Sequence, residues 1–256
     1  MQGFKQTLTL GTIFFILLPA AHAEEAFDPF FELLVMGGIA TLDANDSSAQ
    51  MTPIQIDKLV QTNDNDWNAG TGQIGIGYVW GLTDDLQLAD TFWFTRLNPQ
   101  LNLYYLGGDI DGDVWRFQNP NYNQAHYESD FNSTRLMFDL ALSVFELEAF
   151  SVYALGGLGI AWNEINYHAQ MNPSCNCEIM DINLDSHHNN GFAYEFGAGI
   201  TYAVMDDMAI SLEYLYTGLN EIQLGNLTDE ANGLTIHGNN FDINTQSVLL
   251  GLRFAL

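Results

Sequence analysis

Segments in which bulky apolar residues occupy every second position recur along the chain, eight times in all. Such a two-residue period is typical of β-strands, because successive side chains of a strand point to opposite faces. The last segment, SVLLGLRFAL (247–256), has bulky apolar residues at each even-numbered position and Arg253 on the opposite face. The segments therefore predict a sheet with one apolar face and one face of small, polar and charged residues.

The connections between the predicted strands are alternately short and long. The predicted strands span residues 31–41, 73–80, 86–97, 134–145, 151–166, 192–204, 209–217 and 243–256, and the third could continue past Pro99 to Tyr105. Short connections fall at 81–85, 146–149 and 205–208, and long ones at 42–68, 106–130, 168–190 and 218–242. A soluble sandwich has no reason to make every second connection long.

A transmembrane β-barrel has this pattern, with tight turns in the periplasm and long loops outside. Backbone groups in lipid must be satisfied within the protein, so a spanning sheet must close on itself. We therefore predict an all-β fold: a transmembrane, antiparallel, up-and-down barrel over residues 24–256. It has eight strands, or ten if residues 97–118 form an extra hairpin. Aromatic residues near the strand ends predict a girdle: Tyr78, Trp80, Trp162, Tyr167, Tyr214 and Tyr216.

The first 23 residues have the features of a secretory signal peptide. Lys5 precedes the uncharged apolar stretch LTLGTIFFILLPA, and the small residues Ala21 and Ala23 lie just before the expected cleavage site, which precedes Glu24. The apolar stretch is shorter than the roughly 20 residues that a spanning helix needs. We expect an exported protein whose signal peptide is removed.

The order of the segments resembles the small bacterial outer-membrane barrels of the OmpA/OmpX and opacity-protein type, over residues 24–256. The resemblance implies an outer-membrane monomer among lipid and lipopolysaccharide, with a structural, adhesion or surface-antigen role. A narrow porin for small solutes is the alternative. It also implies that the outer-membrane insertion machinery reads the final strand. In that family the last residue is typically aromatic, whereas here Leu256 is last and Phe254 is the nearest aromatic on that face.

The chain is strongly acidic, with a formal net charge of −26. This charge excludes nucleic acid as a partner, because nucleic-acid binding depends on Lys and Arg contacts to phosphate. Among the long connections the only basic residues are Lys58 and Arg116. The acidic loops predict a surface that repels its neighbours, gathers divalent cations, or meets a basic partner on a host cell or another protein.

Charged residues also occur on the predicted inner face of the barrel. An eight-stranded barrel is only wide enough inside to hold side chains, so charges there should pair with one another. They form a plug of ion pairs, a charged constriction in a small conducting path, or a catalytic pair of carboxylates. The predicted lumen charge network consists of Glu32, Arg135, Asp139, Glu195, Glu213 and Arg253.

Two candidate metal sites lie in the predicted loops. In GGDIDGDVW (107–115), Asp109, Asp111 and Asp113 alternate around Gly112, as oxygen ligands of calcium can, although the full twelve-residue calcium loop is absent. Cys175, Cys177 and His187 could bind a transition metal, since thiolate and imidazole suit zinc or copper. A strained local disulfide, or two thiols without a role, is the alternative for the cysteines.

No catalytic constellation is evident, so we predict a protein that is not an enzyme and needs no cofactor. Barrel enzymes of the lipid A deacylase type place a His and a Ser two residues apart near a strand end. Here His126 and Ser129 are three apart and lie in a predicted loop. Neither the spacing nor the position matches.

Overall fold

The computed structural model describes residues 29–44, 47–52, 55–62, 67–82, 87–89, 92–93, 95–147, 149–171, 182–223, 227–229, 234–236 and 240–256. The predicted signal peptide lies outside these residues. The barrel strands are β1 (Phe30–Ala44), β4 (Ala69–Gly81), β7 (Arg96–Trp115), β8 (Asn123–Leu147), β9 (Phe150–Met171), β10 (Ile182–Met205), β11 (Met208–Gln223) and β14 (Asn240–Ala255). The shorter strands are β2 (Ser47–Thr52), β3 (Gln55–Gln61), β5 (Gln87–Ala89), β6 (Phe92–Trp93), β12 (Leu227–Asp229) and β13 (Leu234–Ile236).

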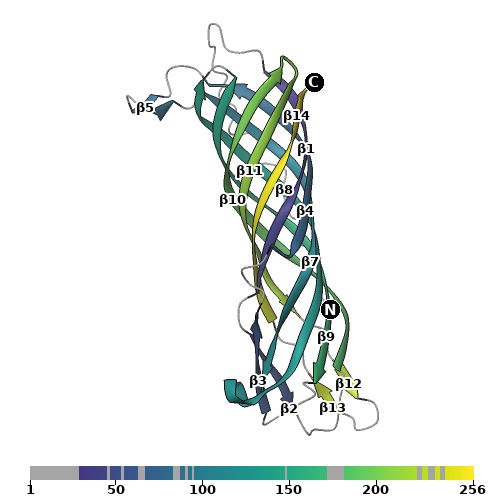
Figure 1. Ribbon diagram of the computed structural model, residues 1–256. Coiled ribbons are helices and arrows are strands. Elements are labelled where there is room, and N and C mark those ends of the chain that lie inside the picture. The colour runs from purple at the N-terminus through teal and green to yellow at the C-terminus, as the bar shows by residue number, and fades with distance from the viewer. Residues whose placement is uncertain are drawn as a thin grey trace, which may run out of the picture.

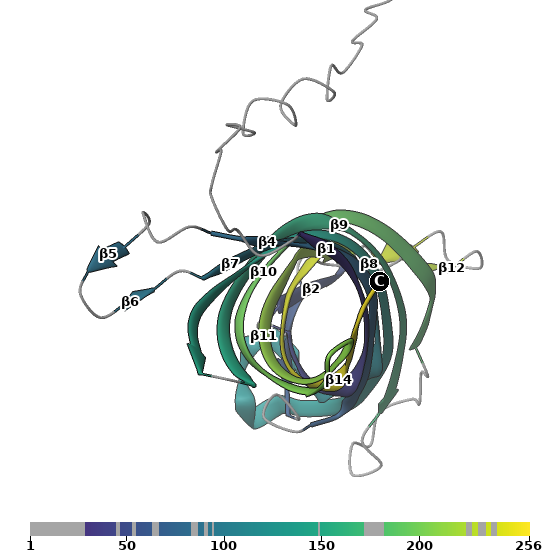
Figure 2. The ribbon, with the colours of Figure 1, turned by 90° about the horizontal axis from the view of Figure 1, so that it is seen from above.

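Eight strands form a closed antiparallel ring in the order β1-β4-β7-β8-β9-β10-β11-β14, and β14 pairs back onto β1 (Figures 1 and 2). Within the ring each of the eight strands pairs with a neighbour on both sides, as a spanning sheet requires. The eight-stranded prediction is therefore confirmed. The ten-stranded alternative is wrong, because residues 96–115 form the single strand β7 rather than a hairpin.

The third predicted strand was placed too early. Residues 87–89 and 92–93 pair only with each other, as β5 and β6, and project to the side of the ring (Figure 2). Pro99 lies inside β7, and the pairing of β7 with β4 is interrupted between Gln100 and Leu97. A proline, which has no N–H to donate, is tolerated at such an irregularity. The predicted short turn at 81–85 is consequently wrong, whereas the turns after β8 and β10 are short as predicted.

The strands run far into the predicted long loops. β8 has 25 residues, whereas a tilted strand crosses a membrane in roughly 10. β7 and β8 fill most of 106–130 and are joined by the 3-10 turns η2 (Arg116–Gln118) and η3 (Pro120–Tyr122). β4 pairs with β7 as far as Ala69, its first residue, and beyond that point β3 pairs with β7 instead. No helix within the described residues is long and apolar enough to cross a membrane.

The polarity of the two wall faces reverses along β7 between Tyr105 and Asp109, where the register with β8 stays constant. Leu101, Leu103 and Tyr105 point outward and are half-exposed, and beyond them Asp109 points outward. The inward side chains change from Asn102 and Tyr104 to apolar ones, which are Leu106, Ile110 and Val114. A lipid-facing wall needs apolar residues outside, and a wall in water needs them inside. The strand therefore leaves the membrane near Tyr105.

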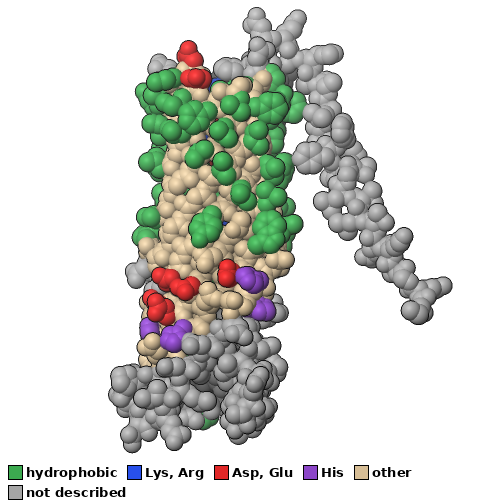
Figure 3. Space-filling model, turned by 90° about the vertical axis from the view of Figure 1, so that its right-hand side faces the viewer, with side chains coloured by type: hydrophobic (Ala, Val, Ile, Leu, Met, Phe, Trp, Pro, Cys, Tyr) green, Lys and Arg blue, Asp and Glu red, His purple; other side chains and the backbone are tan. Residues whose placement is uncertain are grey.

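The same reversal divides the wall into two parts. We call the part with apolar outward side chains the belt (on β7, residues 97–105). The tower is the part beyond it: residues 106–115, 123–133, 163–171 and 182–191, with β2 and β3. Figure 3 shows the green belt, with acidic and histidine side chains directly beyond it. The sequence-based prediction took the loss of outward apolar residues for the end of the strands.

The interior of the tower is an apolar core. Tyr127 and Tyr167 stack inside it with ring centroids 5.5 Å apart, and both are buried. The expectation that Tyr167 belongs to an aromatic girdle is thus wrong. Other members of this core are Leu59, Leu106, Ile110, Phe131 and Ile165, and Leu42 of β1 and Leu219 of β11 belong to the same apolar cluster.

Candidate functional site: the charged lumen of the belt

Arg253 on β14 is the centre of the lumen cluster nearer the C-terminal end of the barrel. Its Nη1 lies 2.8 Å from Oε1 of Glu32, its Nη2 donates to Oη of Tyr153 at 2.9 Å, and its Nε donates to Oγ of Ser211 at 3.0 Å. The guanidinium also lies over the Tyr153 ring, 4.8 Å from its centroid. All of these side chains are buried.

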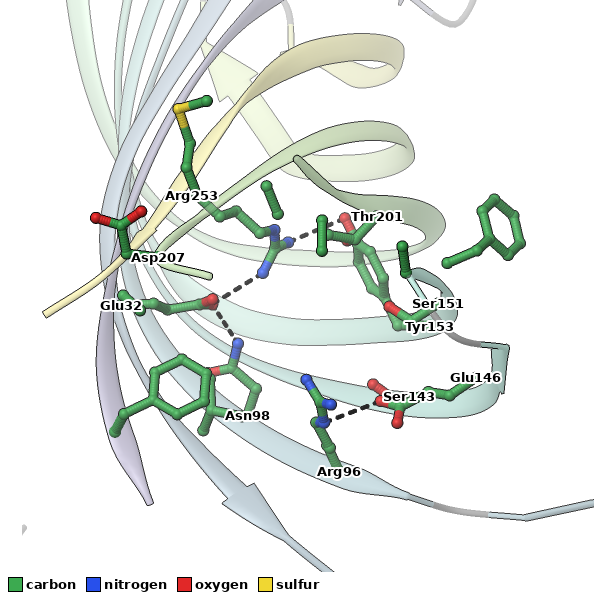
Figure 4. A pocket seen from close by; sticks show the side chains of 18 of the residues that line it. Glu32, Arg96, Asn98, Ser143, Glu146, Ser151, Tyr153, Thr201, Asp207 and Arg253 are labelled. Carbon is green, nitrogen blue, oxygen red and sulfur yellow. Dashed lines mark hydrogen bonds and ion pairs between the residues drawn. The ribbon is translucent and has the colours of Figure 1, made fainter. Parts of the chain in front are cut away.

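Two further groups extend this cluster. Glu213 lies 3.6 Å from Arg253 and accepts a 2.7 Å hydrogen bond from the Tyr153 hydroxyl, and Asn98 donates to Glu32. Glu32 on β1 and Tyr153 on β9 come from opposite sides of the ring. Arg253 therefore joins one wall to the other across the lumen, as Figure 4 shows. We call these residues the Arg253 cluster.

A vestibule of about 190 Å³ opens at the end of the barrel where the chain terminates, and the Arg253 cluster lies at its inner end (Figure 4). Arg96 and Glu146 form a 3.0 Å ion pair on its wall, where both side chains are partly exposed. Apolar side chains, among them Phe30, Phe150 and Met208, line the remainder.

Deeper in the belt, Asp139 on β8 is the centre of a second cluster. It accepts hydrogen bonds from Nδ2 of Asn102 at 2.6 Å and from the Tyr104 hydroxyl at 3.3 Å. The guanidinium of Arg135 lies over the Tyr104 ring, 5.1 Å from its centroid. A Cβ on Gly157 would lie 1.7 Å from Oδ1 of Asp139, so this glycine makes the room that the carboxylate occupies.

Some buried lumen atoms have no hydrogen-bond partner among the described residues. They include Nε and Nη1 of Arg135, Oδ1 of Asp139 and Oε1 of Glu195. The other carboxylate oxygen of Glu195 accepts a 3.4 Å hydrogen bond from Thr217. Because buried polar groups are normally hydrogen-bonded, this part of the lumen has the chemistry to hold water.

All six residues of the predicted lumen network point into the barrel and are buried there, but they form two clusters rather than one. The prediction did not name the neutral partners, above all Tyr153, Tyr104 and Asn102. Tyr153 could have been found from its alternation with Leu155 and Gly157, which places it on the inner face. The distribution of partners between two clusters depends on the strand register, which a sequence pattern does not supply.

The acidic residues of the candidate calcium site lie in a row on the outer face of β7. Asp109, Asp111 and Asp113 alternate along a strand, so their placement in a loop is wrong. Oδ1 of Asp113 lies 3.4 Å from Nδ1 of His126 on β8. Partial burial and the neighbouring Asp130 carboxyl raise the pKa of Asp109.

The described part of the chain contains no group of three or more His, Cys, Asp or Glu side chains that could hold one metal ion. Cys175 and Cys177 lie outside the described residues, whereas His187 is part of β10 and is half-buried. Calcium binding and transition-metal binding stay predictions.

The closed ring, its apolar belt and its polar lumen together define an outer-membrane β-barrel protein. The chain belongs to the family described as the outer membrane protein beta-barrel domain, whose model matches residues 11–254. This membership confirms the predicted fold and the location in the bacterial outer membrane.

Among solved structures, the chain is similar to Neisserial surface protein A (11% identity, TM-score 0.37), covering 91% of this chain and 100% of that one. It is similar to OprG from Pseudomonas aeruginosa (13% identity, TM-score 0.36), covering 88% and 95%. It is also similar to the outer membrane protease OmpT from Escherichia coli (10% identity, TM-score 0.48), covering 92% and 99%. At these identities the likeness concerns the fold alone. Comparison with curated proteins gives no match.

Proposed function

We propose that this protein has a structural and adhesive or antigenic role at the cell surface, through the acidic outer face of its tower, and that its barrel does not conduct. The Arg253 cluster is the observation that carries the proposal. It joins β1 to β9 across the lumen through buried hydrogen bonds and an ion pair. An ion crossing here would have to separate Arg253 from Glu32, and removing one partner of a buried pair costs about 3–5 kcal/mol.

The outer face of the tower supports an interaction with a basic partner. Asp109, Asp111 and Asp113 on β7 lie opposite Asp130, Glu128 and His126 on β8. These six positions point outward from a wall whose interior is packed, so the rigid strands present the carboxylates in fixed rows. Electrostatic complementarity of this kind favours a positively charged surface on a host cell or another protein.

Planar-bilayer conductance of the refolded protein tests the closed lumen. We expect a silent bilayer, with folding checked by the heat-dependent shift of barrel mobility on gels. Arg253→Ala, which removes the crossing side chain, is the comparison variant. Regular conductance steps from the unaltered protein would refute the proposal and support the alternative, a narrow channel for small solutes. That alternative is favoured by the lumen atoms that have no hydrogen-bond partner among the described residues, such as Nε and Nη1 of Arg135.

Attachment to cells or to an immobilised basic protein tests the tower. Changing Asp109, Asp111 and Asp113 together to Asn should reduce attachment and its sensitivity to salt. A matched variant with Asp206 and Asp207, which lie in the turn at the opposite end, changed to Asn should bind normally. Equal attachment by both variants would contradict a role of the acidic rows.

We also propose that the protein has no enzymatic activity. Overexpression should leave the lipid A and phospholipid profiles of the cell unchanged. A new lipid species that depends on the protein would contradict this part of the proposal.

A further inference from the structure

A hollow of about 440 Å³ lies on the outer wall of the barrel, where the belt meets the tower. Its lining comes mostly from the outward faces of β7, β8, β9 and β10, together with the buried Asn163 of β9. It is separate from the lumen, which lies on the other face of the same strands. The hollow opens sideways, at the level where the outward side chains change from apolar to polar.

Two rows of cross-strand neighbours form this hollow. The belt row runs across the four strands as Tyr105, Thr134, Trp162 and Asn190. The tower row, one outward position further along, runs as Gly107, Asn132, Glu164 and His188. Small residues, Thr134 and Gly107, therefore alternate with large ones, and this alternation makes the depression.

The side chains around the hollow are partly held in place and partly available. Tyr105 donates a 2.9 Å hydrogen bond to Oδ1 of Asn132, which fixes one wall. A Cβ on Gly107 would lie 2.9 Å from that same oxygen, so the glycine leaves room for the hydrogen bond between Tyr105 and Asn132. Trp162 is 43% exposed and forms the opposite wall.

Within the described structure, no side-chain hydrogen bond or ion pair is recorded for Glu164, His188 or Asn190, although their backbones pair in the sheet. Together they offer a carboxylate, an imidazole and an amide, which can both donate and accept hydrogen bonds. These are the groups that hydroxyl-bearing ligands require.

The composition of the hollow selects against an anionic ligand. It contains the carboxylate of Glu164 and no Lys or Arg, so a phosphate group would meet a like charge rather than a partner. Two aromatic faces on either side of Thr134 instead suit the C–H face of a sugar ring. The sugar hydroxyls would then reach Asn132, Glu164 and His188.

We propose that this hollow binds the uncharged sugar headgroup of a glycolipid in the surrounding leaflet. The sugar ring lies between Tyr105 and Trp162, and the acyl chains lie along the apolar belt below them. The position of the hollow at the boundary between apolar and polar wall favours a membrane glycolipid over a free sugar, since only the lipid satisfies both sides of the boundary.

Native mass spectrometry of the protein released from detergent, with monoglucosyl diacylglycerol as the probe, tests the site. Trp162→Leu keeps an apolar side chain in the belt, and Glu164→Gln removes only the charge; each should weaken binding about tenfold. Tyr105→Phe should also weaken it, because Asn132 loses its hydrogen bond. Tyr214→Phe is the matched control. It removes a similar 2.8 Å hydrogen bond, to Gln246, from another part of the belt, and should leave binding unchanged.

Normal binding by both Trp162→Leu and Glu164→Gln would overturn the proposal. Equal binding of phosphatidylglycerol with the same acyl chains would also overturn it, because the wall would then select only acyl chains. Equal affinity for soluble methyl glucoside would overturn the assignment to a membrane lipid. Preference for the glucosyl lipid, lost in these variants and retained in Tyr214→Phe, supports it.

Discussion

Replacing Arg253 with Met should destabilise the barrel far more than the loss of one surface charge. The guanidinium is buried and contacts Glu32, Tyr153, Ser211 and Glu213. Met fills similar volume, but it leaves two buried carboxylates without their cation. Breaking a buried pair in this way costs about 3–5 kcal/mol, and about 4 kcal/mol corresponds to roughly a thousandfold change in the unfolding equilibrium constant.

Equilibrium unfolding by urea in lipid vesicles, followed by tryptophan fluorescence, measures this cost. Arg96→Met is the matched control, because Arg96 forms a 3.0 Å pair with Glu146 at a partly exposed position. Exposed pairs contribute about 0–1 kcal/mol. A loss for Arg253→Met no larger than that for Arg96→Met would refute the reasoning.

A second variant separates the buried charges from the lost packing. Adding Glu32→Gln and Glu213→Gln to Arg253→Met removes the carboxylate charges that the first substitution leaves unpaired. Replacing all members of a buried ion pair with uncharged residues of similar volume often changes the free energy of unfolding little. The triple variant should therefore recover most of the loss. A triple variant as unstable as Arg253→Met would show that packing, rather than charge, is responsible.

The remaining predictions concern the seam, where β14 pairs with β1 and closes the ring, the lipid-facing side of the belt, and the tower. Gly38→Ala should abolish the heat-modifiable folded form on gels, because its Cβ would lie 1.9 Å from the Val248 carbonyl oxygen; Gly37→Ala, with 3.9 Å to its nearest atom, should fold normally. Leu158→Arg, on the lipid face, should cost about 2–4 kcal/mol in urea unfolding, whereas a basic residue at Asn166 in the tower should cost little. The raised pKa of Asp109 means that the folded state holds this proton more tightly than the unfolded state, so its contribution to stability falls as pH rises above the ordinary carboxyl range. Asp109→Asn should therefore slow amide exchange in β7 at neutral pH and have no effect near pH 3; an equal effect at both would contradict the assignment.

The alternation of side chains was sufficient to predict the ring and the inward position of the charged residues. Arg253 alternates with Leu252 and Phe254 in a segment whose two-residue period is typical of a strand, and a narrow barrel leaves its charge only the lumen. The partners of Arg253 could not be predicted in this way. They depend on which residues of β1, β9 and β11 lie at the same height, and this register is set by contacts between strands far apart in the chain.

The prediction was wrong where the environment of a strand changes along its length. Asp109, Asp111 and Asp113 were assigned to a loop because a lipid-facing strand cannot end in outward carboxylates. They continue β7 into water, where Ile110 and Val114 take over the apolar role on the inner face. The other error is the placement of the third barrel strand at 86–97 instead of 96–115. It arose from Pro99 and from the apolar residues of 86–97, since an apolar alternating segment need not belong to the barrel.

The seam between β1 and β14 also has a consequence for the order of folding. Glu32 and Arg253 are separated by 221 positions, nearly the length of the chain. Contacts between distant residues form slowly, because the entropy of bringing the ends together is lost before any contact compensates for it. The pairing of β1 with β14 therefore cannot form until the last strand has been synthesised and has reached the membrane. Until then Glu32 faces water as an ordinary solvated acid, and it becomes a buried partner of Arg253 only in the step that completes the ring.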